Sequence, residues 1–319
     1  MKAGSDATAR AERELFVRTR LARLTEPGLG SLAARLAHEV IFAPGQVIYR
    51  EGDPPTDFYA FLRGQIEVIT NDLPPWILRD QGGVGLIDVL AEKPRNATVV
   101  AYSNVKAMRI AAHDYLDFLE EHFELALESA LRAAQDVHDL SVILAPDGGF
   151  RPLDVPPVIA SAPNPFTLVQ KIEALQKARV FRKANVQSLV KLAMIAHEVH
   201  FDAEEVVFHR GAASGRFYLV GQGVVEASLA EHHLTARFGE GDVVCGYGAL
   251  GAADNQYVAV ARTPAIVFWF SEEDFFDVME EHFSLCRSVL AAIAADYTRL
   301  VLERERRAAL AASSNASIA

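Results

Sequence analysis

"AHEVIFAPGQVIYREG", residues 37–52, returns as "AHEVHFDAEEVVFHRG" at residues 196–211. In both copies, short runs of alternating apolar and polar residues are followed by a closing glycine. Alternation with a period of two is typical of a β-strand that buries one face. The stretch therefore predicts short paired strands, and its return predicts that the chain carries them twice.

Two further segments repeat with nearly the same spacing. "DFYAFLRGQIEV" (57–68) returns as "RFYLVGQGVVEA" (216–227), which lies 159 residues further along the chain. "LEEHFELA" (119–126) returns as "MEEHFSLC" (279–286), at a spacing of 160 residues. A spacing that holds across three separate segments indicates a tandem duplication.

A proline-rich stretch separates the two copies. Six of the 14 prolines of the chain fall between residues 146 and 165, and proline cannot continue a helix or a central strand. We therefore expect a flexible N-terminus at 1–10, a first domain at 11–145, a linker at 146–165, a second domain at 166–308 and a flexible C-terminus at 309–319.

Each copy contains many short strands, regular glycine turns and terminal helices. Short helices are predicted at 31–37 and 186–196, directly before the strands of each copy, and longer helices follow the strands. This order favours an α+β protein that is mainly β. We expect two tandem β-rolls of the jelly-roll type, each with flanking N- and C-terminal helices.

The composition narrows the class of protein. The formal net charge of -11 gives no attraction to nucleic acid or to an anionic membrane. The longest apolar stretch, residues 257–270, is interrupted by Arg262 and is too short to span a bilayer. The start of the chain has no apolar core of a signal peptide, and two cysteines cannot form a disulfide framework. We expect a cytoplasmic protein with no membrane span and no DNA binding.

One stretch in the first copy matches a known ligand-binding motif. "VGLIDVLAEKPRNATVVA" (84–101) follows, without a gap, the pattern F-G-E-x-A-L, spacer, R-x-A-T-V-x-A. The start of the same copy matches F-x-x-G-x-x-I through Phe42, Gly45 and Ile48. Each copy therefore resembles a cyclic nucleotide-binding domain, the module of catabolite activator proteins, protein kinase A regulatory subunits and cyclic-nucleotide-gated channels.

The resemblance implies a phosphate-binding site in the first copy. Arg95 takes the place of the family's arginine, which holds the cyclic phosphate, and a guanidinium offers a charged planar fork to phosphate oxygens. Backbone N–H groups near 87–90 would add positive potential. The implied ligand is cyclic AMP or cyclic GMP, and no cofactor is expected. The candidate site residues are Gly85, Leu86, Ile87, Asp88, Arg95, Asn96 and Ala97.

Two residues of this first site depart from the family pattern. Leu86 replaces the glutamate that binds the ribose 2′-hydroxyl, and losing such a bond costs about 1.5–3 kcal/mol, or roughly 10- to 150-fold in affinity. Asp88 replaces a small residue beside the phosphate, where a carboxylate would repel an anion. Two readings stay open: Arg95 binds an anion, or Arg95 closes an internal salt bridge with Asp88.

The second copy departs further. "FGEGD" (238–242) imitates the cassette but lies too far from the closing Ala261, so we expect it to end a strand and open a turn. The spacing favours "CGYGALGAADNQYVAVA" (245–261), which has neither the glutamate nor the arginine. We expect this pseudo-site to be degenerate. Its residues are Gly246, Tyr247, Gly248, Ala249, Asn255 and Gln256.

No pattern in the chain predicts catalysis or metal binding. His197 and His200 lack the spacing of a zinc helix, and on a strand they point to opposite faces. No nucleophile and base are grouped, and no glycine-rich nucleotide loop is present. We therefore expect a non-enzymatic protein without a metal site.

Two functions fit these observations. The first is a regulator that senses a cyclic nucleotide or another small anion through its first domain and signals to a separate protein effector. Residues 303–319 are too short for a helix-turn-helix module, and no inhibitory Arg-Arg-x-Ser/Ala sequence precedes the first roll. The alternative is a scaffold or dimerisation protein that binds no ligand.

An apolar stripe on the last helix suggests a homodimer seam. Its members are Val289, Ile293, Tyr297 and Leu300.

Overall fold

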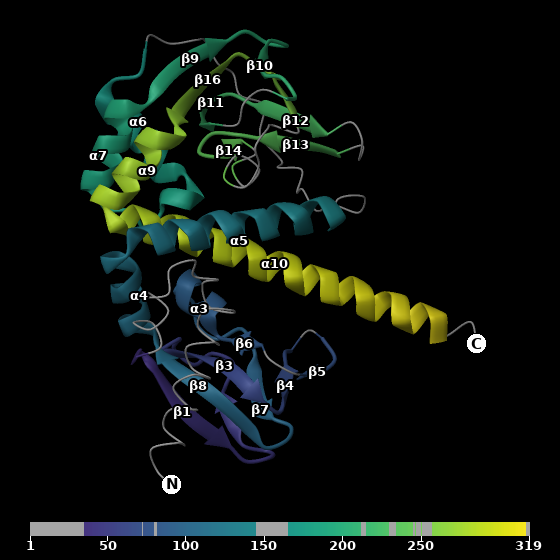
Figure 1. Ribbon diagram of the computed structural model, residues 1–319. Coiled ribbons are helices and arrows are strands. Elements are labelled where there is room, and N and C mark those ends of the chain that lie inside the picture. The colour runs from purple at the N-terminus through teal and green to yellow at the C-terminus, as the bar shows by residue number, and fades with distance from the viewer. Residues whose placement is uncertain are drawn as a thin grey trace. The chain divides into compact units, whose positions relative to one another are not determined.

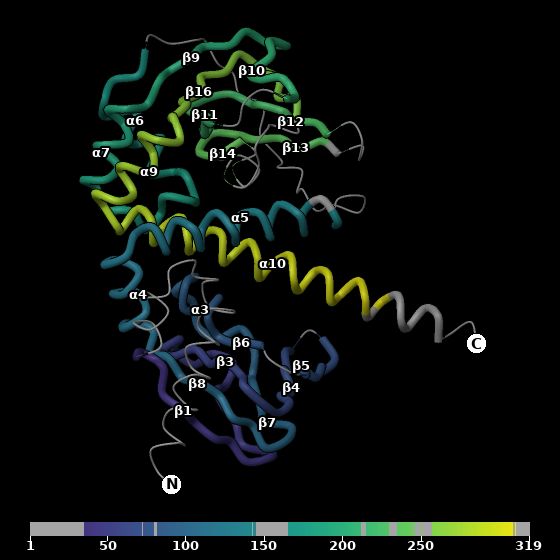
Figure 2. Tube along the Cα trace, viewed as in Figure 1, coloured from purple at the N-terminus to yellow at the C-terminus, as the bar shows by residue number. Residues whose placement is uncertain are grey.

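The computed structural model describes residues 35–71, 73–79, 82–144, 165–211, 215–229, 234–244, 246, 250 and 257–316, which Figure 2 traces in colour apart from a few helical positions. The predicted flexible N-terminus and nearly all of the proline-rich linker lie outside these residues. Two compact units are present. One extends to Ser129 and includes the chain from Leu302 onward, and the other comprises Ala130–Val301.

The first unit contains two four-stranded antiparallel sheets, with strand orders β1-β8-β3-β6 and β2-β7-β4-β5. Figure 1 shows these strands as purple to blue arrows. Their inward side chains form one buried cluster that includes Ile66, Val68 and Val99. The strands are β1 (Ala37–Phe42), β2 (Val47–Tyr49), β3 (Asp57–Arg63), β4 (Gln65–Ile69), β5 (Trp76–Arg79), β6 (Gly83–Val84), β7 (Thr98–Ala101) and β8 (Val105–Ala111).

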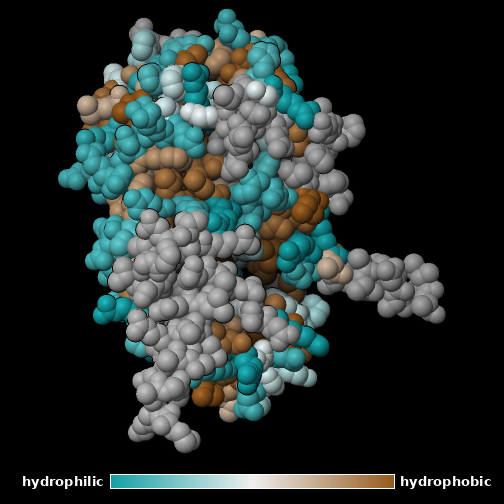
Figure 3. Space-filling model, in the orientation of Figure 1, coloured by the Kyte–Doolittle hydropathy of each residue, from teal (hydrophilic) through white to brown (hydrophobic). Residues whose placement is uncertain are grey.

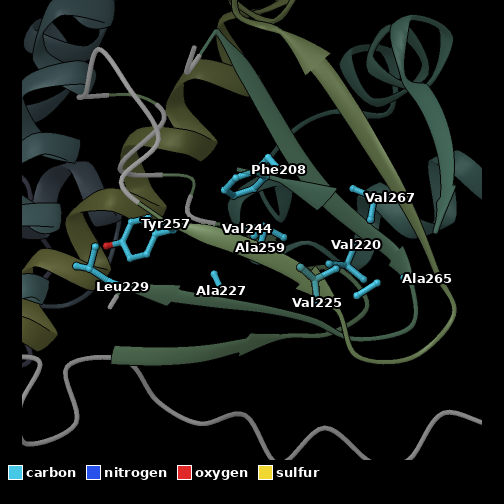
Figure 4. Packing of buried hydrophobic residues seen from close by; sticks show 11 residues of the cluster. Phe208, Val220, Val225, Ala227, Leu229, Val244, Tyr257, Ala259, Ala265 and Val267 are labelled. Carbon is cyan, nitrogen blue, oxygen red and sulfur yellow. The ribbon is translucent and has the colours of Figure 1, made fainter. Parts of the chain in front are cut away.

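The second unit repeats this topology strand for strand. Its sheets have the orders β9-β16-β11-β14 and β10-β15-β12-β13, and Figure 4 shows the buried cluster within them. The predicted fold class, mainly β with two tandem rolls and flanking helices, is confirmed. The strands are β9 (His197–Phe201), β10 (Val206–Phe208), β11 (Arg216–Gln222), β12 (Val225–Leu229), β13 (Leu234–Phe238), β14 (Val243–Val244), β15 (Val258–Ala261) and β16 (Ala265–Ser271).

Equivalent glycines make the same tight turn in both rolls. Gly64 and Gly223 have φ values of 104° and 88°, a region that favours glycine. A Cβ at either position would collide with a backbone carbonyl oxygen, of Asn104 in the first roll and of Pro264 in the second. The turn therefore requires glycine for its backbone angle and for its close contact.

Helices flank both rolls, as expected from the sequence. Helix α7 matches the helix predicted at 186–196 almost to the residue. The helix predicted at 31–37 does not reach its expected end, because Ala37 already begins β1, and residues 31–34 lie outside the described chain. The helices are α3 (Leu86–Ala91), α4 (Ala112–Glu121), α5 (Phe123–Leu144), α6 (Leu168–Lys177), η3 (Arg179–Phe181), α7 (Val186–Ile195), α9 (Glu272–Glu281) and α10 (Phe283–Ala316).

Three of the four residues in the apolar stripe of α10 are buried, and Tyr297 is half-buried. Val289, Ile293 and Leu300 are each only 1% exposed, and hydrogen bonds to Ser284 and Ser288 tie the start of the helix to residues 183–185. The stripe therefore does not form the exposed dimer seam suggested by the sequence. Helix α10 also continues to Ala316, into the segment predicted to be flexible, because this alanine-rich segment has high helix propensity.

No described helix is both long and apolar enough to cross a membrane. On the face shown in Figure 3, hydrophilic and hydrophobic residues are interspersed over the coloured surface.

Candidate ligand-binding site

The candidate arginine lies in the loop between α3 and β7, and the turn after β2 fixes the backbone of this loop. The Arg95 N–H donates to the Asp53 carbonyl at 2.9 Å, and the Arg95 carbonyl accepts from the Gly52 N–H at 2.9 Å. Next to them, the Glu51 N–H donates to Oγ1 of Thr98 at 3.0 Å. Two segments that are remote in sequence therefore hold the position of the arginine.

The Arg95 side chain is buried and points inward. It is only 2% exposed, with Cζ 4.3 Å from the ring centroid of Tyr49. Nη1 donates to the Gly85 carbonyl at 3.0 Å, and Nη2 donates to the Asp57 carbonyl. The guanidinium thus joins the start of α3 to the start of β3.

Asp88 supplies the only carboxylate paired with Arg95 among the described residues. Its Oδ2 lies 3.7 Å from Nη1, and its side chain is 7% exposed. Burial raises the pKa of Asp88 above its ordinary value, and this effect exceeds the lowering by the Arg95 charge. The structure therefore brings Gly85, Asp88 and Arg95 together, with the internal ion pair of the second reading formed.

One donor of the guanidinium has no partner in the described structure. Nε of Arg95 is buried and makes no hydrogen bond to any described residue. A buried donor left unsatisfied costs about 1–3 kcal/mol, and more when it is charged. The internal contacts of Arg95 therefore leave one charged N–H group without an acceptor.

The remaining predicted residues have different environments. Leu86 and Ile87 are half-buried in the first turn of α3, Asn96 is exposed, and Ala97 is buried in the roll. Gly85 precedes the helix with φ of 89°, and a Cβ there would collide with Nη1 of Arg95. Glycine at this position is thus required for the observed arginine conformation.

Two residues of the site were missed from the sequence. Tyr49 stacks on the guanidinium, and Asp57 accepts from it through its backbone. The Asp57 carboxylate is engaged elsewhere, since Oδ1 lies 2.8 Å from both Nε and Nη2 of Arg109. A comparison of the two copies could have drawn attention to Asp57, because the equivalent residue in the second copy is Arg216.

The second copy has a larger residue at the position of Ala97. Tyr257 aligns with Ala97, is only 4% exposed and belongs to the core cluster, and Figure 4 shows it at one end of that cluster. Its ring centroid lies 6.0 Å from that of His138. Tyr247, Gly248, Ala249, Asn255 and Gln256 lie outside the described residues, and Gly246 is helical.

The imitation motif at 238–242 is a turn, as predicted. Phe238 ends β13. The Gly239 N–H donates to Oδ2 of Asp242 at 2.9 Å, and the Gly241 N–H donates to the Val220 carbonyl at 2.8 Å. The carboxylate therefore closes a local turn.

Among the described residues, no cluster of three or more His, Cys, Asp or Glu side chains could hold a metal ion.

The sequence matches the model of one protein family twice. The cyclic nucleotide-binding domain matches residues 39–122 and 198–282, together more than half of the chain. The chain belongs to the cyclic nucleotide-binding domain family and carries two copies of the domain. The search of curated protein sequences found no match.

Solved structures with related folds include regulatory and enzymatic proteins. The cAMP-bound protein PfPKA-R shares 12% identity, with 92% of this chain and 90% of that chain covered and a TM-score of 0.35. The regulatory subunit of a cAMP-independent protein kinase A from Trypanosoma brucei shares 16%, with coverages of 86% and 88% and a TM-score of 0.33. A cAMP-binding acyltransferase from Mycobacterium smegmatis shares 24%, with coverages of 40% and 41% and a TM-score of 0.31. The family assignment rests on the sequence match, since these structural similarities are low.

Proposed function

We propose that the first domain binds a cyclic nucleotide or another small anionic ligand at Arg95, and that this binding regulates a separate protein partner. The unpaired Nε–H of Arg95 carries the proposal. A phosphate oxygen would satisfy this donor, and a charge-assisted hydrogen bond of this kind is about twice as strong as a neutral one. Family membership supplies the ligand class.

The proposed site departs from the family pattern at the position that would bind the ribose of the ligand. Leu86 offers no hydrogen bond to a ribose hydroxyl, so the affinity depends strongly on the contact with Arg95. Cyclic AMP and cyclic GMP are therefore the first ligands to test. Guanosine is a useful comparison because it has a ribose and a base but no phosphate.

A thermal-shift titration tests the proposal. Ligand at 100 times its dissociation constant stabilises the folded state by about 2.7 kcal/mol, so we expect cyclic AMP or cyclic GMP to raise the Tm while guanosine does not. Arg95→Ala should abolish the shift. Arg95→Gln should abolish it too, and it retains N–H groups for the Gly85 and Asp57 carbonyls if Arg95→Ala does not fold.

Arg79→Gln is the matched control. Arg79 is an exposed arginine at the end of β5 in the same domain, and it takes no part in the described contacts of Arg95. Its replacement should leave the ligand-induced shift intact. A shift that survives in both Arg95 variants, or no shift at millimolar nucleotide at any pH from 4.5 to 8, would contradict the proposal.

The proposal also concerns the rest of the chain. The second domain carries a degenerate pseudo-site that binds no ligand. The protein is not an enzyme and requires no cofactor. It is cytoplasmic and signals to a protein effector. A homodimer stays a prediction, and since the α10 stripe is buried, a dimer would use another surface. The alternative, a scaffold without ligand, is favoured by the Arg95–Asp88 pair.

A further inference from the structure

Asp88 lies where it competes with an incoming anion. The carboxylate and any ligand phosphate would share one buried cation, the Arg95 guanidinium, whose side chain is 2% exposed. Two anions next to one cation in a poorly solvated site repel each other more strongly than they would in water. Anion binding therefore requires that Asp88 withdraw or lose its charge.

Few groups are placed to compensate for that charge. Arg95 and Tyr49 are the described ionisable side chains whose charges act on Asp88. Burial first, and then the Asp88 carboxylate, raise the pKa of the Tyr49 hydroxyl, so it stays neutral. Behind Arg95, the Asp57 carboxylate is already engaged by Arg109. No second described cation reaches Asp88 to balance a ligand phosphate.

Protonation requires less rearrangement than withdrawal. Asp88 is the third residue of α3, a six-residue helix directly after Gly85, and its backbone carbonyl accepts from the Lys93 and Glu92 N–H groups. These contacts hold the residue next to Arg95. Burial already favours the neutral carboxyl, and a phosphate nearby would favour it further.

We propose that Asp88 acts as an internal competitor for Arg95, so that anion binding by the first domain is coupled to the uptake of one proton by Asp88. This inference rests on the proposed function, since it concerns the same site. The proton comes from solvent, and the carboxylate of Asp88 becomes a carboxylic acid. The site would then select for anions and respond to pH.

Calorimetric titration with cyclic AMP from pH 4.5 to pH 8 tests the coupling. The phosphodiester of cyclic AMP stays charged throughout this range, so a pH effect reports on the protein. For the wild-type chain we expect binding to tighten by up to tenfold per pH unit as the pH falls. Buffers of different ionisation enthalpy should show uptake of up to one proton per ligand.

Asp88→Asn should bind more tightly at pH 7, with little dependence on pH and without proton uptake. Glu240→Gln is the control. It removes one negative charge from a turn of the second unit, where Glu240 pairs with Lys177 at 2.8 Å. Its affinity and its pH dependence should match those of the wild type. The number of protons that the wild-type chain takes up per bound ligand tests the coupling without relying on the folding of any variant.

The outcomes separate the two proposals. Equal, pH-independent binding by the wild type and Asp88→Asn overturns the coupling and leaves the proposed function standing. Binding by Asp88→Asn alone at pH 7 supports the coupling. No binding by either protein at any pH overturns the proposed function and, with it, the coupling.

Discussion

Gly85 and Gly52 adopt similar left-handed backbones, with φ of 89° and 85°, but their surroundings differ. A Cβ at Gly85 would strike Nη1 of Arg95, whereas a Cβ at Gly52 would meet no atom within 4 Å. The two positions therefore separate the cost of the backbone angle from the cost of moving the arginine.

Gly52→Ala should cost about 1–2 kcal/mol of stability, the usual penalty for a left-handed residue. Gly85→Ala should cost more, because the guanidinium must move and a charge-assisted hydrogen bond worth about 1.5–3 kcal/mol is lost. Urea unfolding of both variants measures the difference. Equal losses would show that Arg95 does not occupy the observed position.

Asp88→Asn should stabilise the folded protein at pH 7. Because burial raises the pKa of Asp88, the folded state holds its proton more tightly than the unfolded chain does. The corresponding stability is present at acid pH and is lost as the pH rises through the folded-state pKa. Urea unfolding at pH 5 and pH 7 should show the advantage of the variant shrinking at the lower pH. A variant less stable than the wild type at pH 7 would refute this sign.

The sequence predicted the arginine of the site but not all of its partners. The register of the cassette located Arg95, and the change from a small residue to Asp88 suggested an ion pair as one of two readings. The acceptor on Asp57 is a backbone carbonyl 38 residues away, and no side-chain pattern marks a carbonyl. The stacking of Tyr49 depends likewise on how β2 packs, which the sequence alone does not define.

At the scale of elements, one carboxylate joins three strands of the second roll. Glu226 on β12 accepts hydrogen bonds from Arg237 on β13 at 2.9 Å, and from Nε and Nη2 of Arg262, just after β15, at 3.0 and 2.7 Å. Burial alone would raise the pKa of Glu226, but the hydrogen bonds from Arg262 and then Arg237 lower it overall. The stability that Glu226 contributes therefore depends on pH in the opposite direction to that of Asp88.

Glu226→Gln should destabilise the second roll at pH 7, by about 1–3 kcal/mol for lost bonds between charged groups. The stability from Glu226 is present above its unfolded pKa and is lost as the pH falls through the lowered folded-state pKa. Acid unfolding followed by circular dichroism should therefore be less steep in the variant. An unchanged acid transition would exclude this role.

Two helices show how much a periodic sequence pattern can predict. The helix at 186–196 was predicted, and in the structure Asn185 caps α7 by accepting from the Ser188 N–H at 2.8 Å. The stripe on α10 was equally clear and suggested a dimer seam, but Val289, Ile293 and Leu300 are buried in the described chain. A periodic apolar face shows that a helix is covered on that side, and it does not show whether the same chain or a second copy covers it.

At the scale of the whole molecule, a duplicated fold has kept its topology while its two sites have diverged. Both rolls have the same strand order, and repeat spacing was sufficient to predict this. The first site presents a buried arginine with one free donor among the described residues. In the second roll, Tyr257 occupies the position of Ala97. We therefore predict one working site per chain.

The stoichiometry of cyclic AMP binding, measured by calorimetry on the wild type and on Arg95→Gln, tests this account most directly. We predict one ligand per chain for the wild type and none for Arg95→Gln. Two ligands per chain, or one that persists in Arg95→Gln, would contradict it.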